Sequence, residues 1–190
     1  MTPSLTTWSR TVAGWLCWFC LFLLWCGRVA MNKISAWDWA ATRKLRNHSW
    51  GSIAISRMGD GWLYAAFVLW GRYSGHRLAA GHVAGCVLVA WGCSSALKVL
   101  IRRRRPHDHL TARIKNQKLA RWNWWRDFPS SLSFPSQHAA CAVAFAVAVP
   151  SVWTALFAGL VCWSRVAIGS HFAGDVLAGI VLGAAAGVWG

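Results

Sequence analysis

The sequence predicts an all-α integral membrane protein: a six-transmembrane-helix bundle with a polar loop and short interfacial helices. Hydrophobic residues make up 56% of its 190 residues, more than an ordinary soluble domain carries. They gather in runs that a strongly basic stretch interrupts. The 16 tryptophans fit this pattern, because indole settles at the lipid–water boundary. The length is that of one domain, residues 1–190.

A membrane helix needs about 20 mainly apolar residues, because the bilayer core cannot satisfy an exposed backbone. Thr11–Gly27 and Leu78–Leu97 meet this requirement clearly, and Val176–Gly190 forms the last apolar run. Within that last run, glycines recur at every fourth position, which favours close approach of another helix. They are Gly179, Gly183 and Gly187.

A weaker span lies in the Trp50–Gly71 region, where Arg57 and Asp60 interrupt the apolar pattern. A charged residue is unfavourable inside a membrane helix. We therefore expect this helix to begin near Gly61 and to end near Tyr73.

The uncharged run Ala139–Trp163 has two interpretations that periodicity does not separate. It forms one long helix, or two short helices that meet at Pro150-Ser151, where proline breaks the hydrogen-bond ladder. A continuous helix would hold His138 and Arg165 roughly 40 Å apart. A reversal at Pro150 would bring both to one membrane face and raise the number of passes to six.

The formal net charge is +15, from 20 Lys and Arg against five carboxylates. Such an excess favours anionic partners: phosphate, acidic lipid or nucleic acid. The seven cysteines lie within apolar runs, so we interpret them as packing residues, and no metal site is predicted.

The first segment with chemical potential is Lys98-x6-Arg105-Pro106, at the end of the third span. If the helix continues to the proline, Lys98, Arg102 and Arg105 share one face. Arg103 and Arg104 are interpreted as a basic interfacial anchor. Lys98 follows twenty uncharged residues, and an ionisable residue at such depth is a functional candidate.

The second segment, 134–138, is Phe-Pro-Ser-Gln-His and directly precedes an apolar run. Ser136 is a natural N-cap, so the backbone N–H groups that follow it form a site for phosphate at a helix N-terminus. His138 then lies in the first turn. Alone, this segment would be no more than a capped helix with an incidental histidine.

The third segment is Ser164-Arg165-x5-His171-x3-Asp175. On a helix, His171 and Asp175 share a face, so the carboxylate can hold the Nδ1–H of the imidazole and leave Nε2 as a nucleophile. Arg165 adds a fork for phosphate oxygens. A buried hydrogen bond is the alternative for a lone His–Asp pair, but the neighbouring arginine and Gly169 favour a catalytic role.

These three segments, in this order, resemble the motifs of the type 2 phosphatidic acid phosphatases, from about Asp60 to the C-terminus. The resemblance implies a membrane lipid phosphatase with a phosphohistidine intermediate and no metal or cofactor. It makes His171 the nucleophile, Asp175 its partner and His138 the general acid. It assigns the phosphate to Lys98, Arg105, Ser136, Gln137 and Arg165.

The chain departs from the family at Gln137, where glycine is usual and its N–H contacts phosphate. Gln137 keeps that N–H, so the departure concerns the shape of the phosphate site and no group that attacks phosphorus or transfers a proton.

Three alternatives compete with a lipid phosphatase. A vanadate-dependent haloperoxidase has a similar site, but those enzymes are larger and soluble. A non-catalytic binder of anionic lipid would explain the basic loop but leaves His171 and Asp175 without a role. A nucleic-acid binder would use similar basic and aromatic residues, but nothing else in the sequence favours it.

The sequence does not determine on which side of the membrane the predicted catalytic site lies. The loop Arg102–Ser133 carries nine Lys or Arg, which a positive-inside count puts in the cytoplasm. The resemblance instead implies the outer, periplasmic face of a bacterial inner membrane. The substrate is equally open among phosphatidic acid, phosphatidylglycerol phosphate, polyprenyl diphosphate and lipid A phosphates.

Overall fold

The computed structural model describes residues 36–46, 49–109 and 132–189. Contacts divide the chain into Met1–Ile34 and Ser35–Gly190, and all that follows concerns the second unit. The predicted span Thr11–Gly27 and most of the basic loop lie outside the described residues, and the single domain 1–190 stays a prediction. The helices of the described part are α2 (Ala36–Leu45), α3 (Trp50–Met58), α4 (Gly61–Tyr73), α5 (Arg77–Ile101), α7 (Gln137–Ala148), α8 (Val152–Ala167) and α9 (Ala173–Trp189).

The regular secondary structure of the described residues is helical, apart from one isolated antiparallel bridge between Arg104 and Leu132. This confirms the all-α prediction for that part of the chain. Among the described helices, only α5, with 25 residues, is long and apolar enough to cross a membrane unaided. The apolar helices α7, α8 and α9 are shorter, with 12, 16 and 17 residues.

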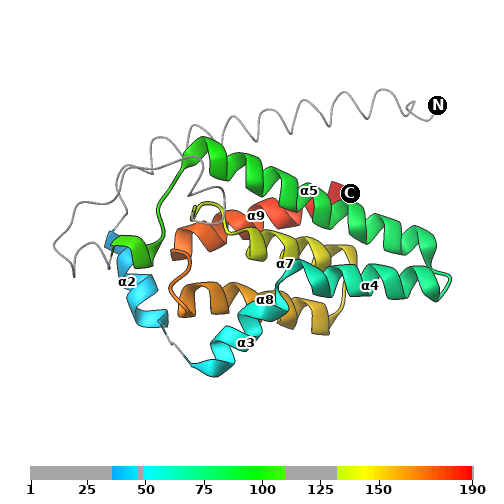
Figure 1. Cartoon of the computed structure of the whole chain (residues 1–190), viewed down its shortest axis with the longest axis horizontal. Helices are drawn as coiled ribbons and strands as arrows, with labels where there is room; N and C mark the ends of the chain where they lie inside the picture. The colour runs from blue at the N-terminus through cyan, green and yellow to red at the C-terminus, as the bar shows by residue number, and fades with distance from the viewer. Residues whose placement is uncertain (1–35, 47–48, 110–131, 190) are drawn as a thin grey trace. The chain divides into compact units, whose positions relative to one another are not determined.

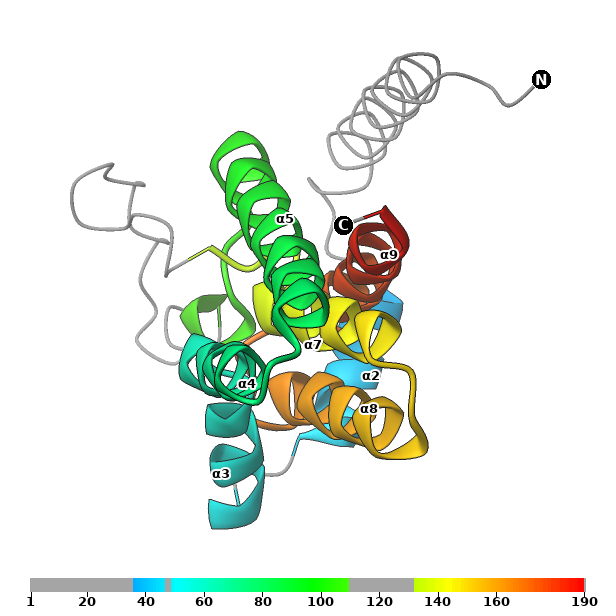
Figure 2. The same cartoon turned by 90° about the vertical axis from the view of Figure 1, so that its right-hand side faces the viewer.

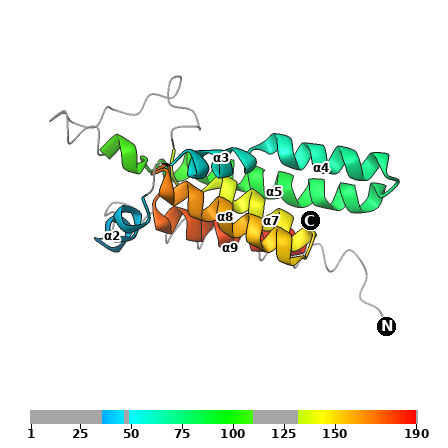
Figure 3. The same cartoon turned by 90° about the horizontal axis from the view of Figure 1, so that it is seen from below.

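Helix α4 has the predicted bounds, Gly61–Tyr73. Asp60 precedes it as the N-cap, and Gly75 ends the segment with a φ of 85°, a conformation that glycine adopts without strain. The chain then reverses into α5, which lies beside α4 (Figure 3). The interruption predicted from Arg57 and Asp60 is therefore the break between α3 and α4.

The run 139–163 folds as two helices, so the interpretation as a reversal is confirmed. Helix α7 ends at Ala148, one residue before Val149-Pro150, and α8 begins at Val152. Ser151 caps α8: its Oγ accepts from the amide of Thr154, whose side chain receives the amide of Ser151 in return. Proline stops one helix and a capping box starts the next.

Helix α7 lies at the centre of the bundle, between α5, α8 and α9 (Figure 2). The predicted glycine stripe of α9 packs on it. A Cβ on Gly179 would lie 2.5 Å from the carbonyl oxygen of Ser136, and one on Gly187 would lie 2.9 Å from that of Ala144. Larger side chains would push α9 away from α7, so the stripe fixes the distance between these two helices.

Candidate active site

The ends of four helices carry the predicted catalytic segments and meet at one end of the bundle (Figure 1). They are the C-terminal ends of α5 and α8 and the N-terminal ends of α7 and α9. The amide of Ser136 donates to the carbonyl oxygen of Asp175 over 2.9 Å, which joins the starts of α7 and α9. His138 and His171 thus lie at the same end, as the reversal at Pro150 predicts.

The first segment differs from its predicted form. Helix α5 ends at Ile101, because Arg102 adopts the left-handed conformation with φ 57° and caps the helix. Lys98 is buried with 4% of its surface exposed, whereas Arg102 is exposed and its Nε donates to the carbonyl of Val99. The expectation of one helical face with Lys98, Arg102 and Arg105 is therefore wrong, because the chain turns before Arg105.

Arg103 is not the interfacial anchor that the sequence suggested. Its side chain is only 7% exposed and lies between two carboxylates. Nη1 is 2.6 Å from Oδ1 of Asp175, and Nη2 is 2.7 Å from Oδ2 of Asp38 on α2. The turn at Arg102 explains the difference, because it directs the next residue into the protein instead of along the helix axis.

Ser136 occupies the predicted N-cap position of α7. Its side chain is fully buried, makes no capping hydrogen bond, and its Oγ has no partner among the described residues. The side chain of Gln137 points away to α5, where Nε2 donates to Ser95 Oγ over 3.0 Å and to the carbonyl of Trp91 over 3.3 Å. Gln137 can therefore bind an anion at this helix start with its backbone N–H but not with its side chain.

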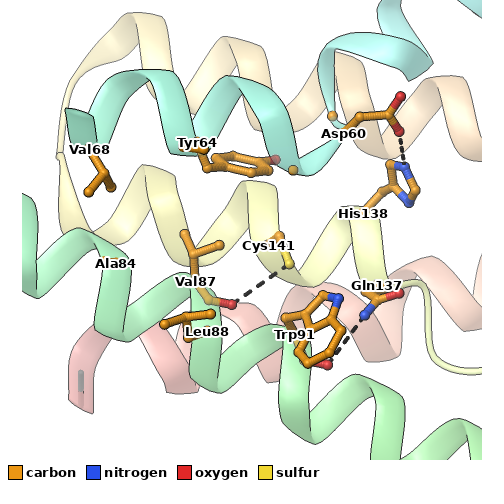
Figure 4. A pocket seen from close by; sticks show the side chains of 13 residues that line it. Asp60, Tyr64, Val68, Ala84, Val87, Leu88, Trp91, Gln137, His138 and Cys141 are labelled. Carbon is orange, nitrogen blue, oxygen red and sulfur yellow. Dashed lines mark hydrogen bonds and ion pairs between the residues drawn. The ribbon is translucent and has the colours of Figure 1, made fainter. Parts of the chain in front are cut away.

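His138 pairs with a carboxylate that the sequence did not assign to the site. Its Nε2 lies 2.8 Å from Oδ1 of Asp60, the N-cap of α4 (Figure 4). A carboxylate bound to imidazole stabilises the protonated ring. Asp60 had been interpreted only as an interruption of a span, although an ionisable residue in an apolar region is itself a signal.

His171 is 1% exposed and lies in the connection between α8 and α9. Its Nδ1 is 2.6 Å from the carbonyl oxygen of Ser133 and 3.8 Å from Oδ2 of Asp175. The carbonyl of Ser133, and not Asp175, thus accepts the Nδ1–H. The predicted direct hydrogen bond is wrong because His171 precedes α9, so the two residues do not share a helical face.

The oxygens of Asp175 are engaged by other donors. Oδ2 accepts from the hydroxyl of Ser133 and, over 2.9 Å, from the amide of Phe172, while Oδ1 binds Arg103. Asp175 therefore fixes Ser133, and Ser133 fixes His171. The pair predicted from spacing acts through an intermediate residue that sequence reasoning missed.

The pKa of His171 lies well below its ordinary value of 6.5. Burial of the ring is the largest cause, followed by the positive charges of Arg165, Arg105 and Lys98. Burial also lowers the pKa of Arg105, whereas the negative charges of Asp108 and Asp175 raise it in part. A neutral imidazole with a bonded Nδ1–H has its lone pair on Nε2, the form that a nucleophile needs.

Arg165 occupies the last turn of α8 and is 8% exposed. Its Nη1 donates to Oγ of Ser56 on α3, a residue that the sequence did not point to. Three cationic side chains thus approach one buried histidine from α5, from the segment after it and from α8. Among the described residues, no cluster of His, Cys, Asp or Glu has the make-up of a metal site.

An apolar groove of about 450 Å³ begins at His138 (Figure 4). Asp60, Gln137 and His138 form its polar end, and the rest runs between α4, α5 and α7. The lining there consists of apolar side chains and one phenol, among them Tyr64, Ala65, Val68, Ala84, Leu88 and Trp91. The groove therefore offers a polar end and a long apolar wall.

Two solved structures share this fold. The chain matches Aquifex aeolicus LpxE with a TM-score of 0.64 and 18% identity, over 82% of this chain and 94% of that one. It matches a transmembrane PAP2-type phosphatidylglycerolphosphate phosphatase from Bacillus subtilis with a TM-score of 0.59 and 20% identity, over 89% and 90%.

In sequence, the chain is 30% identical over 141 residues to the decaprenylphosphoryl-5-phosphoribose phosphatase of Mycobacterium tuberculosis. The matched segment covers 72% of this chain and 63% of that relative, so the chain spans less than two thirds of its length. Residues 78–190, more than half of the chain, match the PAP2 superfamily. They include the three motif segments, and the chain belongs to the PAP2 superfamily.

Proposed function

We propose that this protein is a membrane lipid phosphatase that removes a terminal phosphate from a lipid through a phosphohistidine at His171. One observation carries the proposal: a buried, neutral histidine with its Nδ1–H bound to Ser133 and three cations close by. Neutral Nε2 supplies the electron pair, and the cations stabilise the negative charge that phosphate brings and that develops further in the transition state.

In the first step, Nε2 of His171 attacks phosphorus and the bond from phosphorus to the lipid oxygen breaks. The departing oxygen takes a proton from His138, so the lipid leaves as an alcohol, or as a shorter phosphate when the substrate is a diphosphate. Asp60 supports this role because its carboxylate holds Nε2 of His138 and favours a proton on the ring.

In the second step, water attacks the phosphohistidine. His138, now neutral, accepts a proton from that water, the N–P bond breaks, and inorganic phosphate leaves with His171 restored. The two histidines thus return to their starting protonation states. No step needs a metal ion or a cofactor.

We assign the phosphate oxygens to Lys98, Arg105 and Arg165 and to the start of α7. There the hydroxyl of Ser136 is buried without a partner among the described residues, and the backbone N–H of Gln137 lies at the positive end of the helix. This explains why a glutamine is tolerated at position 137: its side chain is used elsewhere.

The groove that starts at His138 supports a lipid as the leaving group. A protonated leaving oxygen at His138 lies at the polar end of the groove, and the attached chain has an apolar wall to follow. Burial of hydrocarbon contributes about 0.8 kcal/mol per CH₂. The polar end thus suits the headgroup and the apolar end suits the chain.

We further propose six membrane crossings, with Thr11–Gly27 as the first, and the catalytic end on the periplasmic face. The fold shared with a transmembrane phosphatase supports a membrane protein. Helix α9 runs from its start beside His171 to Trp189, so a tag on the next residue, Gly190, should be accessible from the cytoplasm in intact cells. A tag that is labelled only from outside the cell would show the opposite orientation.

For the substrate, the names of the relatives suggest a prenylphosphoryl-5-phosphoribose and phosphatidylglycerol phosphate. The resemblance of the motifs adds phosphatidic acid, a polyprenyl diphosphate and a lipid A phosphate, which completes a panel of five. All five carry a terminal phosphate for the cationic side chains and an apolar chain for the groove.

Phosphate release by the purified full-length chain in detergent tests the proposal. We expect release from at least one member of the panel, persistence of activity in EDTA, and inhibition by vanadate, which mimics pentacoordinate phosphorus. The His171→Ala variant is the matched control. No release from any lipid phosphate, with vanadate bound, would favour the non-catalytic lipid binder instead.

A further inference from the structure

Asp38 lies outside the three motif segments, and Arg103 is one of the residues of the first segment without a predicted catalytic role, yet both side chains are buried beside the site. Asp38 belongs to α2, upstream of the residues that match the superfamily. It is 7% exposed, between two exposed or half-buried tryptophans. A carboxylate at such depth requires strong partners, because burial of a lone charge is unfavourable.

The carboxylate of Asp38 joins two parts of the site. Its Oδ1 accepts from the amide of Gly174 over 2.9 Å, in the first turn of α9. Its Oδ2 lies 2.7 Å from Nη2 of Arg103. A negative group at this helix start is favourable, and the same group directs the guanidinium.

Arg103 completes the connection to the histidine. Its Nη1 binds Asp175 over 2.6 Å, and its backbone carbonyl accepts from the amide of Ser133 over 2.7 Å. Ser133 in turn donates its hydroxyl to Asp175 and accepts the Nδ1–H of His171 with its carbonyl. Both terminal nitrogens of Arg103 are therefore bound to carboxylates, which leaves this arginine a different role from Arg105 and Arg165.

Aromatic packing supports the same connection. The guanidinium carbon of Arg103 lies 4.6 Å from the ring centre of Phe172, the residue after His171. Trp39, next to Asp38, meets that ring edge-on with centres 5.2 Å apart. Helix α2 thus contacts Phe172 through the ring of Trp39, and through the ion pair of Asp38 it also contacts Arg103, which packs on the same ring.

We propose that Asp38 and Arg103 are positioning residues for His171, acting through Asp175 and Ser133. The inference rests on the proposed function and assigns α2 a part in catalysis. The series runs from Asp38 to Arg103, Asp175, Ser133 and His171, each member held by the one before it. It fixes the direction of Nε2 and contributes no contact to the phosphate.

Two variants of the full-length protein test this, Asp38→Asn and Arg103→Lys. Asparagine keeps an acceptor for Gly174 but loses the ion pair, and lysine keeps the charge but cannot span two carboxylates with a planar fork. We expect kcat for lipid phosphate hydrolysis to fall about 10-fold and about 100-fold, because small misplacements of a reacting group have effects of that order. KM and the Kd for vanadate should stay within about twofold of wild type.

Thr42→Val is the matched control on the same helix. Thr42 lies one turn after Asp38, is 3% exposed, and its Oγ1 has no partner among the described residues. Its replacement by an isosteric apolar residue should leave kcat unchanged. Thermal unfolding in detergent identifies any variant that does not fold. If one of the two variants fails to fold, the kcat of the other one tests the positioning role.

Each outcome has one meaning. A fall in kcat with unchanged vanadate binding supports positioning. A wild-type kcat in Asp38→Asn overturns the role of α2, and a loss of vanadate binding in Arg103→Lys moves Arg103 to the phosphate site and overturns its positioning role. Failure of the proposed function looks different, because the wild-type chain itself would then release no phosphate.

Discussion

The two histidines of the site have opposite surroundings. His171 is almost fully buried, faces a backbone carbonyl and is 3.8 Å from the nearest carboxylate oxygen of Asp175. The side chain of His138 is 26% exposed, opens on a groove and is bound directly to the carboxylate of Asp60. The first arrangement favours a neutral ring, as a nucleophile requires, and the second places a carboxylate where it stabilises a proton on the ring, as a general acid requires.

Arg103 explains how this difference is maintained. It forms an ion pair with Asp175, the carboxylate that the sequence assigned to His171, and Ser133 bonds that carboxylate with its hydroxyl and the ring with its carbonyl. Asp60, in contrast, binds the ring of His138 directly. Two His–Asp pairs thus differ in chemistry because a third residue intervenes in only one of them.

The largest expected effect follows removal of the nucleophile. His171→Ala should reduce phosphate release by a factor on the order of 10⁶, as loss of a nucleophile does in other hydrolases. A labelled lipid phosphate should give an acid-labile, base-stable phosphoenzyme in the wild type and none in the variant. Label retained by His171→Ala would assign the attack to another residue and remove the contrast between the two histidines.

The next effect separates the general acid from the nucleophile. His138→Ala should lower kcat about 10²–10⁴-fold on an alkyl phosphate and far less on a diphosphate, whose leaving group departs without help. Asp60→Asn should show the same dependence on leaving group with a smaller loss. The ratio of the rates on the two substrates measures this, and equal losses on both would argue against the acid role.

A smaller effect tests whether the groove beside His138 holds the lipid chain. Ala65 lines the groove, whereas the equally exposed Ala66 is not among its lining residues. Ala65→Phe should lower kcat/KM about 10-fold on a long-chain lipid phosphate and leave a short-chain analogue unaffected. Ala66→Phe should change neither; if the two variants behave alike, the chain lies elsewhere.

The smallest effect concerns stability in acid. The pKa of His171 is held well below 6.5, chiefly by burial, whereas in the unfolded chain it returns to about 6.5. The unfolded state thus binds more protons as the pH falls below that value, so the contribution of His171 to stability is present above it and lost in acid. The Tm of the wild type in detergent should fall between about pH 7 and about pH 5, and the Tm of His171→Gln should fall less over the same range. An identical fall in both proteins would show that His171 is not the cause.

Much of this molecule follows from local patterns. Apolar runs predicted α4, α5 and α9, proline predicted the break between α7 and α8, and the glycine stripe predicted a closely packed neighbour. Each depends on residues near one another in sequence, where spacing and backbone preference decide the outcome. The three motifs also predicted His138, His171 and the cations as one site, because the resemblance rests on their order and spacing along the chain.

The partners of those groups depend on tertiary structure. Asp60 and Asp38 reach their partners from helices 78 and 65 positions away, to His138 and Arg103 respectively. The left-handed turn at Arg102 ends α5, and Arg103 then reaches Asp38 and Asp175 instead of following the helix axis. A sequence determines which groups are present and which lie on one helix, but hydrogen bonds across the bundle are set by how its helices pack, and spacing along the chain carries no record of that packing.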